Sequence, residues 1–149
     1  MRENPFDPCR RCNVPTVTLT IPGKPYAKAR PRFSRKTGRA YDPKENVKAE
    51  ASVGTIALPH FPQPIPGPVW LNVICVFEVP KSWPKKRRAA ALGGPHTSKP
   101  DCDNVVKSIK DGLTRIAWAD DAQVWRETTI KTWGETASTT VTIMWDDAL

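Results

Sequence analysis

The chain has 149 residues, of which 23 are Lys or Arg and 15 are Asp or Glu, so its formal net charge is +8 and its pI is about 9.6. This length favours one domain that buries roughly two-thirds of its unfolded surface. The surplus of positive charge predicts a polyanionic partner, most simply nucleic acid, with a merely solubilising basic surface as the alternative. Because no apolar run reaches 18 residues and no signal-peptide pattern opens the sequence, we expect a cytoplasmic protein without a membrane partner.

Residues 1–15 are polar and contain prolines, and we expect them to form an arm that precedes a domain at 16–149. Cys9 and Cys12 in this arm make a C-x-x-C pair, which is half of a zinc site. A structural zinc site needs four ligands, and neither Cys75 nor the two histidines have a matching spacing. Zinc binding and redox chemistry stay open beside a plain arm, and we expect all four cysteines to be free thiols.

A β-branched, alternating run from Thr16 to Ile21 predicts a strand, which Pro22-Gly23 ends. Residues 24–43 are strongly basic, and their prolines and glycine forbid a continuous helix, so we expect an extended hairpin with its turn at 36–38. Such a hairpin displays cations to DNA phosphates and aromatic rings to unpaired bases, although it could merely solvate an edge strand. The predicted DNA contacts here are Lys28, Arg30, Arg32, Arg35 and Lys36, interleaved with Tyr26, Phe33 and Tyr41.

A helix is predicted from Lys44 to Leu58, after an acidic cap at Asp42 and a proline at its start. We expect it to be amphipathic and to pack on the sheet. The proline-rich segment 61–68 reads as a stiff loop. Residues 69–79 are the most strand-like run of the chain and should form a central strand. The helix has only modest apolar residues for packing, namely Val47, Ala51, Ile56 and Ala57.

The long segment 80–100 is a second basic block that leads directly into an acidic motif. Long loops in compact domains are usually functional or disordered, and within this one residues 85–91 are good helix formers. His96 could bind a metal, but we expect it to be a simply exposed loop histidine. The predicted DNA contacts of this block are Lys85, Lys86, Arg87, Arg88 and Lys99.

Between Lys99 and Gln123 the basic chain gathers five aspartates. Two ionised carboxylates about 4 Å apart repel each other by roughly 4 kcal/mol at an effective dielectric constant near 20. A shared proton or a hard divalent cation would offset this repulsion, and an oxygen-only ligand set favours Mg²⁺ or Mn²⁺ over Zn²⁺. The alternative is that these acids are helix caps and turn residues. The five are Asp101, Asp103, Asp111, Asp120 and Asp121.

A helix is predicted over about 104–116, with Val105, Ile109, Leu113 and Ile116 at the spacing of a buried face. Lys107 follows Asp103 by four residues, so the two side chains share one side of the helix. The pair is either an ordinary ion pair, worth a few tenths of a kcal/mol, or a lysine placed beside a metal-bound phosphate. Asp111, one turn further, could pair with Lys107 or Arg115.

The runs 122–132 and 136–145 predict two antiparallel strands joined near Gly134. With that arrangement Asp121, just before the first of these strands, would turn back towards Asp101 and Asp103. The element order therefore predicts a single α+β domain, in which a mixed sheet of about four to five strands packs against two main helices.

The pattern K-P-D-x-D-N-x-x-K at 99–107, followed by D-G-L at 111–113, Trp118 and D-D-x-Q-V at 120–124, resembles the RusA family of Holliday junction resolvases, which are small phage and bacterial endodeoxyribonucleases. The resemblance also reaches residues 28–41. It implies a RusA-like fold and a Mg²⁺-dependent homodimer, with Mn²⁺ able to substitute and no small-molecule cofactor. It places the catalytic acids and metal ligands on Asp101, Asp103 and Asp121, the catalytic lysine on Lys107, and Asn104 and Asp120 just outside the metal ligands.

The resulting hypothesis is a structure-selective endodeoxyribonuclease of a bacterial or phage-infected cell that resolves four-way DNA junctions. A dimer with two-fold symmetry would supply the two matched nicks, one from each protomer. Two alternatives stay open. One is a nuclease for other branched DNA, replication forks, flaps or RNA. The other is a non-catalytic DNA-binding protein, for which the basic segments suffice without the aspartates.

Overall fold

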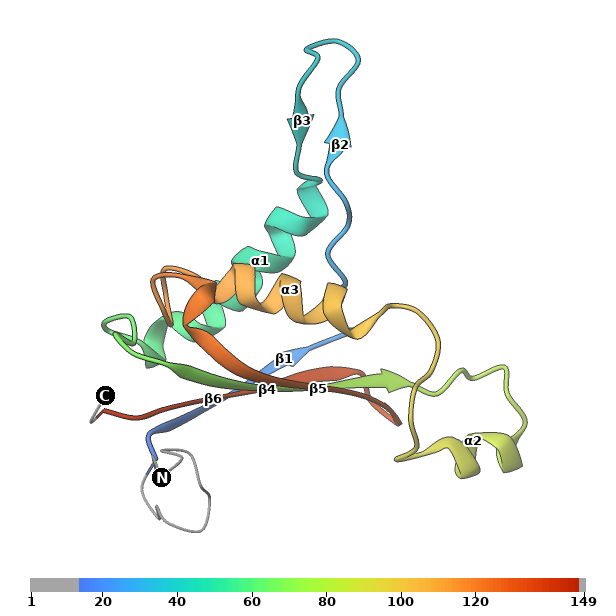
Figure 1. Cartoon of the computed structure of the whole chain (residues 1–149). Helices are drawn as coiled ribbons and strands as arrows, with labels where there is room; N and C mark the ends of the chain where they lie inside the picture. Colours follow the sequence, from blue (N-terminus) through green and yellow to red (C-terminus); the bar gives the residue numbers. More distant parts are fainter. Residues whose placement is uncertain (1–13, 148–149) are drawn as a thin grey trace.

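The computed structural model describes residues 14–147, so the predicted arm's Cys9 and Cys12 lie outside the described part, as do residues 148–149. The observed order of elements matches the predicted order, and the fold class is confirmed as a single α+β domain (Figure 1). The elements are β1 (Thr16–Pro22), β2 (Arg32–Phe33), β3 (Ala40–Tyr41), α1 (Lys44–Ala57), η1 (Leu58–His60), β4 (Val69–Glu78), α2 (Lys85–Ala91), α3 (Cys102–Leu113), η2 (Asp121–Gln123), β5 (Val124–Gly134) and β6 (Ser138–Trp145).

Four strands form one mixed sheet in the order β1-β6-β4-β5, so β4 is central as predicted. β6 runs antiparallel to β1 and β4, whereas β4 and β5 are parallel. The expectation of a joined antiparallel pair near Gly134 is wrong in its pairing, because β4 lies between β5 and β6. The connection crosses β4 so closely that a Cβ atom on Gly134 would lie 2.5 Å from Val76 Cγ1. Glycine is therefore required at that crossing.

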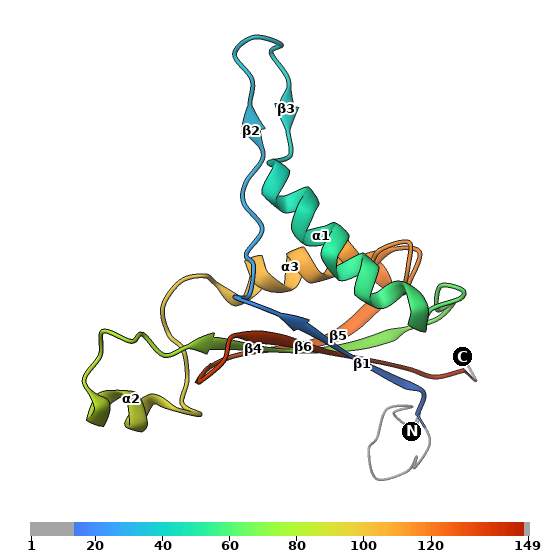
Figure 2. The ribbon, with the colours of Figure 1, turned by 180° about the vertical axis from the view of Figure 1, so that it is seen from behind.

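One face of the sheet is covered by α1 and α3, as the two opposite views show (Figures 1 and 2). The alternate residues of β4 from Val69 to Phe77 point into this layer and are buried. From α3 the predicted core residues Val105, Ile109 and Leu113 are buried with them. At about 25 cal/mol per Å² of apolar surface removed from water, this layer is the main source of stability.

The helix α1 packs against α3 more than against the sheet, so its predicted apolar face is only partly correct. Val47 is 56% exposed, whereas Val53, Gly54 and Ala57 are buried. The two helices approach closely because each has a glycine at the crossing. A Cβ atom on Gly112 would lie 2.9 Å from Val53 Cβ, and one on Gly54 would lie 2.9 Å from Ile116 Cδ1.

The helix α3 ends at Leu113, three residues earlier than the pattern predicts. Thr114 adopts an extended backbone and Arg115 has a φ of 74°, which turns the chain so that the Arg115 amide donates to the Trp118 carbonyl at 2.6 Å. Trp118 is fully buried beneath this turn. The turn determines where the chain re-enters the sheet as β5.

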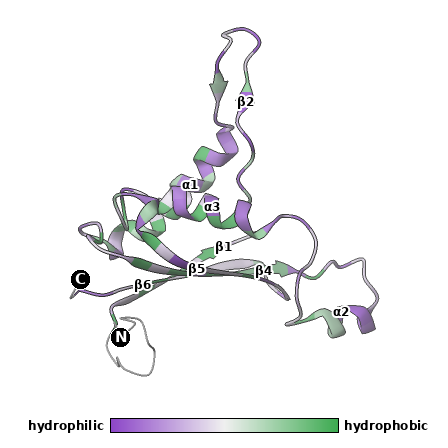
Figure 3. Cartoon of the chain, in the orientation of Figure 1, coloured by the Kyte–Doolittle hydropathy of each residue, from purple (hydrophilic) through white to green (hydrophobic). Residues whose placement is uncertain are grey.

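The segment 80–100, called here the α2 lobe, contains the predicted short helix as α2 and returns along the free edge of β5. Amide groups of Gly93 and His96 donate to the carbonyls of Trp133 and Lys131. Figure 3 shows hydrophilic residues along much of the β2-β3 ribbon and at one end of α2, whereas the rest of α2 is more hydrophobic. Within residues 14–147 no helix has both the length and the apolar character needed to span a membrane.

His96 is buried at 6% exposure, so the expectation of an exposed loop histidine is wrong. Its ring stacks on Phe77 with centroids 4.0 Å apart and packs against Trp133 at 4.3 Å. Trp83 meets the other side of Trp133 at 5.2 Å. Aromatic packing thus holds the α2 lobe against the sheet. The same packing buries His96 between Phe77 and Trp133.

Burial, followed by the positive charge of Lys131, lowers the pKa of His96 below its ordinary value. The unfolded chain therefore takes up a proton near pH 6.5 that the folded chain resists, and folding stability falls as pH drops from about 6.5 through the folded pKa. We expect His96→Phe, which keeps the aromatic stack, to lose less stability than wild type between pH 7 and pH 5. Urea unfolding at each pH measures the difference, and the exposed-site variant His60→Gln should keep the wild-type slope. Equal slopes in all three proteins would contradict this result.

Candidate active site

Asp101 and Asp103, called here the acid pair, lie at the N-terminus of α3. Asp101 occupies the N-cap position but makes no side-chain capping hydrogen bond, and Asp103 is in the first turn. Both are exposed. No described residue, from 14 to 147, forms a hydrogen bond or ion pair with either carboxylate. The Asp101 side chain therefore does not cap the helix, although the residue occupies the N-cap position.

Asp121 lies at the other end of α3, in η2, just before β5. Cys102 Sγ lies 3.9 Å from the Thr129 carbonyl, so the start of α3 faces the middle of β5, and roughly 17 Å of strand separates Thr129 from Val124. The expectation that Asp121 turns back to the acid pair within one chain is wrong. Because β4 and β5 are parallel, α3 is a crossover helix that runs back along the sheet, and the strand after it starts at its far end.

Asp120 has a local structural role. Its Oδ1 accepts from the Ala122 amide at 2.8 Å, and Gln123 Oε1 accepts from the Asp120 amide at 3.1 Å, which together make a capping box on η2. Gln123 also donates to the carbonyls of Ile65 and Gly67. These contacts fix the loop that carries the neighbouring Asp121, which is exposed.

The chemistry of the donors suits a hard cation, since the acid pair offers only carboxylate oxygens. Within residues 14–147, however, no three His, Cys, Asp or Glu side chains come together in an arrangement that could hold a metal ion. At this place the described part of the chain thus offers a cation only the carboxylates of the acid pair. Lys107 is exposed one turn after Asp103 and forms no ion pair with it or with any other described residue. Its ammonium remains available to an anion.

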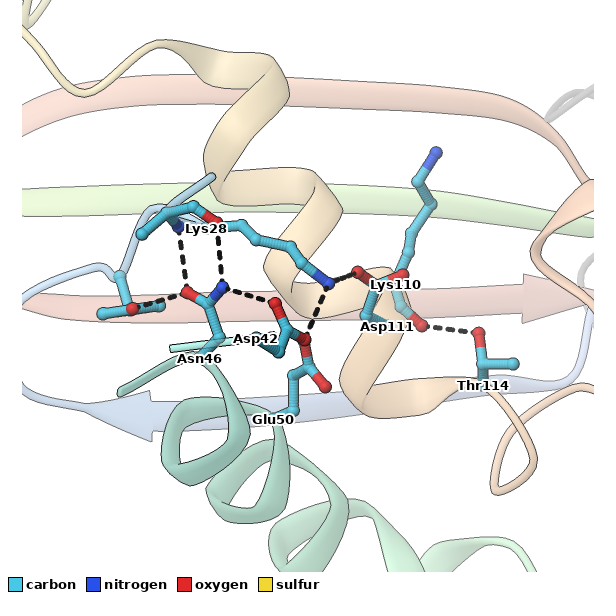
Figure 4. Close-up of polar contacts among 9 residues, drawn as sticks. Lys28, Asp42, Asn46, Glu50, Lys110, Asp111 and Thr114 are labelled. Carbon is cyan, nitrogen blue, oxygen red and sulfur yellow. Dashed lines mark hydrogen bonds and ion pairs between the residues drawn. The ribbon is translucent and has the colours of Figure 1, made fainter. Parts of the chain in front are cut away.

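A polar cluster that the sequence reasoning missed joins the base of the ribbon to α1 and α3 (Figure 4). The Lys28 ammonium donates to Asp111 and, at 3.0 Å, to Glu50, with Asp42 at 3.9 Å. Although partial burial opposes its charge, the hydrogen bonds to Asp111 and then to Glu50 raise the pKa of Lys28. The predicted partners of Asp111, Lys107 or Arg115, are replaced by Lys28. This lysine was predicted as a DNA contact, yet its charge is already matched by carboxylates.

Asn46 completes the cluster and is fully buried. Its side-chain amide exchanges hydrogen bonds with both backbone groups of Ala29, at 2.9 and 2.8 Å, and it accepts from the Tyr26 hydroxyl at 2.7 Å. The Lys28 amide donates to the Asn104 carbonyl at 2.9 Å. The base of the basic ribbon is thereby fixed beside the first turn of α3. Only the tertiary fold brings these residues together, so no spacing in the sequence could reveal them.

We expect Lys28→Met to lower the free energy of unfolding by about 1–3 kcal/mol, because it leaves Glu50 and Asp111 facing each other without a cation. The raised pKa of Lys28 means that this stabilisation is fully present at neutral pH and is lost only as pH rises through that pKa. Urea unfolding at pH 7 measures the loss. Lys36→Met, on the exposed tip of the ribbon, is the matched control, and equal stability of the two variants would disprove the role of the cluster.

Basic side chains extend from two places near the acid pair. The ribbon carries Arg30, Arg32, Arg35 and Lys36, all exposed, and it rises from the end of α3 where the helix begins (Figure 1). The α2 lobe lies beyond the same end and exposes Lys85 and Lys86, with Lys99 on its return. Two of its predicted DNA contacts are partly engaged, since Arg87 stacks over Trp83 at 3.7 Å and the Arg88 Nε atom is buried. The acid pair is thus flanked by two basic projections.

The chain is similar to known proteins over most of its length. The family model described as endodeoxyribonuclease RusA matches residues 22–144, which include the ribbon, the acid pair, Lys107 and Asp121. The uncharacterized protein YqaN of Bacillus subtilis (strain 168) is 36% identical over 115 residues, which is 72% of this chain and 81% of YqaN. Because the family match spans most of the chain, it indicates common ancestry and not only a shared local motif. The chain therefore belongs to the RusA endodeoxyribonuclease family.

Proposed function

We propose that the protein is a homodimeric endonuclease that resolves four-way DNA junctions by paired nicks, with Mg²⁺ or Mn²⁺ as its cofactor. The observation that carries the proposal is the exposed acid pair, which has no structural partner in residues 14–147 and lies between two basic projections. The helix N-terminus stabilises each carboxylate singly, and where two ionised carboxylates converge on one point a shared cation or proton offsets their repulsion. Membership of an endodeoxyribonuclease family supports a role for the acid pair in cleaving DNA phosphodiester bonds.

The dimer is proposed to complete the ligand set. Because Asp121 and the acid pair occupy opposite ends of α3 in one chain, a single protomer holds two half-sites that are separated along the direction of β5. A two-fold axis that places two copies antiparallel would bring the acid pair of each protomer to Asp121 of the partner subunit. Each of the two complete sites would then contain Asp101 and Asp103 of one protomer and Asp121 of the partner subunit.

In such a site each residue has a distinct task. The oxygens of the acid pair would hold the divalent cation. When bound, the cation would polarise the scissile phosphate and make a bound water more acidic. The Lys107 ammonium, exposed one turn along α3, would lie beside the scissile phosphate and stabilise the negative charge that develops on it. The ribbon and the α2 lobe would bind the flanking phosphates by charge neutralisation. Two such sites in a symmetric dimer would cut two opposed strands.

A nuclease for forks, flaps or other branched DNA, or for RNA, would use the same residues, and a non-catalytic DNA-binding protein would need only the basic projections.

The decisive experiment is incubation with a synthetic mobile four-way junction, a fork, a flap, linear duplex and RNA, each with and without Mg²⁺. Symmetric nicks with 5′-phosphate and 3′-hydroxyl ends, confined to the junction and requiring the metal, are expected. Binding without any cutting in Mg²⁺ or Mn²⁺ would overturn the proposal, and preferential cutting of another substrate would redirect it.

A further inference from the structure

A groove of about 570 Å³ runs between the base of the ribbon and the first turns of α3. Its walls include Lys28, Arg30, Tyr41 and Asp42 from the ribbon side and Asn104 and Lys107 from α3. Its volume lies within the roughly 300–1,000 Å³ that encloses one small organic ligand. This is the scale of a single nucleotide and not of a paired duplex.

Two cations are exposed at the mouth of the groove. Arg30 and Lys107 are exposed, and neither forms an ion pair with any residue in 14–147. Lys28 is paired with Glu50 and Asp111, and the Asp42 carboxylate, which accepts from Asn46 at 3.1 Å, keeps its negative charge. Two cations therefore remain for an anionic ligand such as a phosphate group.

An aromatic ring is exposed in the same groove. Tyr41 is 49% exposed, and its hydroxyl has no partner among the described residues. The other aromatic residues of the ribbon differ from it, because Tyr26 donates to Asn46 and is half-buried, while Phe33 is 68% exposed outside the groove. Tyr41 is thus the one ring of this segment that combines exposure with neighbouring cations and a free amide on Asn104.

We propose that this groove binds one unpaired nucleotide of the DNA substrate, with its base stacked on Tyr41 and its phosphate held by Arg30 and Lys107. Aromatic stacking on a base is largely independent of its sequence, while the Asn104 side chain offers both a donor and an acceptor to a base edge. The inference rests on the proposed nuclease function and extends it to substrate choice. Because Asn104 follows Asp103 directly, a strand held here is led to the acid pair, and DNA with an unpaired nucleotide near the branch point is selected over continuous duplex.

The test measures binding in the presence of EDTA, without metal. The probes are a four-way junction with 2-aminopurine next to the branch point, a short single strand with the same base, and a linear duplex. Wild type should quench the 2-aminopurine fluorescence of the first two probes. Tyr41→Ala should abolish the quenching and weaken binding of those probes by about tenfold, with duplex binding unchanged. Tyr41→Phe, which keeps the ring, should behave as wild type.

Equal loss in Tyr41→Ala and Tyr41→Phe, or a loss by Tyr41→Ala that extends equally to duplex, would overturn the groove as a nucleotide site. Thermal unfolding of each variant checks that the exposed substitution leaves the fold intact. The readout is independent of cutting. If wild type quenches but never cuts, the nuclease proposal fails and the groove stands; if wild type cuts junctions without quenching that depends on Tyr41, only the groove fails.

Discussion

Replacement of Asp103 by alanine is expected to reduce junction cleavage by about 1,000-fold, equivalent to ~4 kcal/mol of transition-state stabilisation. The carboxylate is exposed in the first turn of α3 and has no partner in residues 14–147, so its removal breaks no internal contact. Binding should persist or strengthen, because both basic projections remain and a negative charge beside the DNA is lost. Gel-shift titration in EDTA and a cleavage time course in Mg²⁺ measure the two effects separately.

The control for this variant is Asp147→Ala, which removes the same charge from an exposed aspartate near the end of β6, whose carboxylate accepts a hydrogen bond from Trp145 Nε1 at 2.7 Å. It should cut at the wild-type rate. The stability cost of Asp103→Ala should stay within about 1 kcal/mol, the size of a lost helix-dipole contact. Metal-dependent cutting retained by Asp103→Ala would remove the acid pair from the reaction, and joint loss of binding and cutting would indicate a structural role.

A second large effect is expected from mixing inactive subunits. Homodimers of Asp103→Asn and of Asp121→Asn should each be inactive, whereas a mixed dimer with one subunit of each kind should regain cutting at one site. In the proposed arrangement, the intact Asp103 of one subunit meets the intact Asp121 of the other, so one of the two sites is complete. The measurement is single-strand nicking of a junction by mixed dimers isolated through two different affinity tags.

The control pairs an Asp101→Asn subunit with an Asp103→Asn subunit. Both defects then fall in the same half of the ligand set, so neither site is complete and no recovery is expected. If each site instead belonged to one chain, the Asp103→Asn with Asp121→Asn mixture would be as inactive as this control. If Asp121→Asn homodimers cut normally, Asp121 would have no part in the site.

The positions of the elements followed from local patterns of the chain. The alternating run of β4, the helix formers of α2 and the helical spacing of Val105, Ile109 and Leu113 all appear in the structure where the sequence placed them. Each of these signals depends on residues close together in the chain, where side-chain periodicity and backbone preference decide the conformation. The family motif likewise depends on near neighbours, and the matched family agrees with it.

Strand pairing did not follow from such patterns. Strands β5 and β6 look like a hairpin because a short glycine-containing segment joins them, but β4 has apolar residues to bury and neighbours to bond on both edges, so it lies between them. That choice makes β4 and β5 parallel and turns α3 into a crossover helix. The consequence is the separation of Asp121 from the acid pair, which local spacing could not reveal.

The sequence by itself determined the element order, the fold class, the basic segments, the acid pair and the family, because each is written in residues that are neighbours along the chain. Only the tertiary structure decided that Lys28 is matched by Glu50 and Asp111, that His96 is buried between Phe77 and Trp133, and that Tyr41 faces a groove. The physical reason is that burial, charge pairing and strand order depend on contacts between distant segments, which form only when the whole core closes.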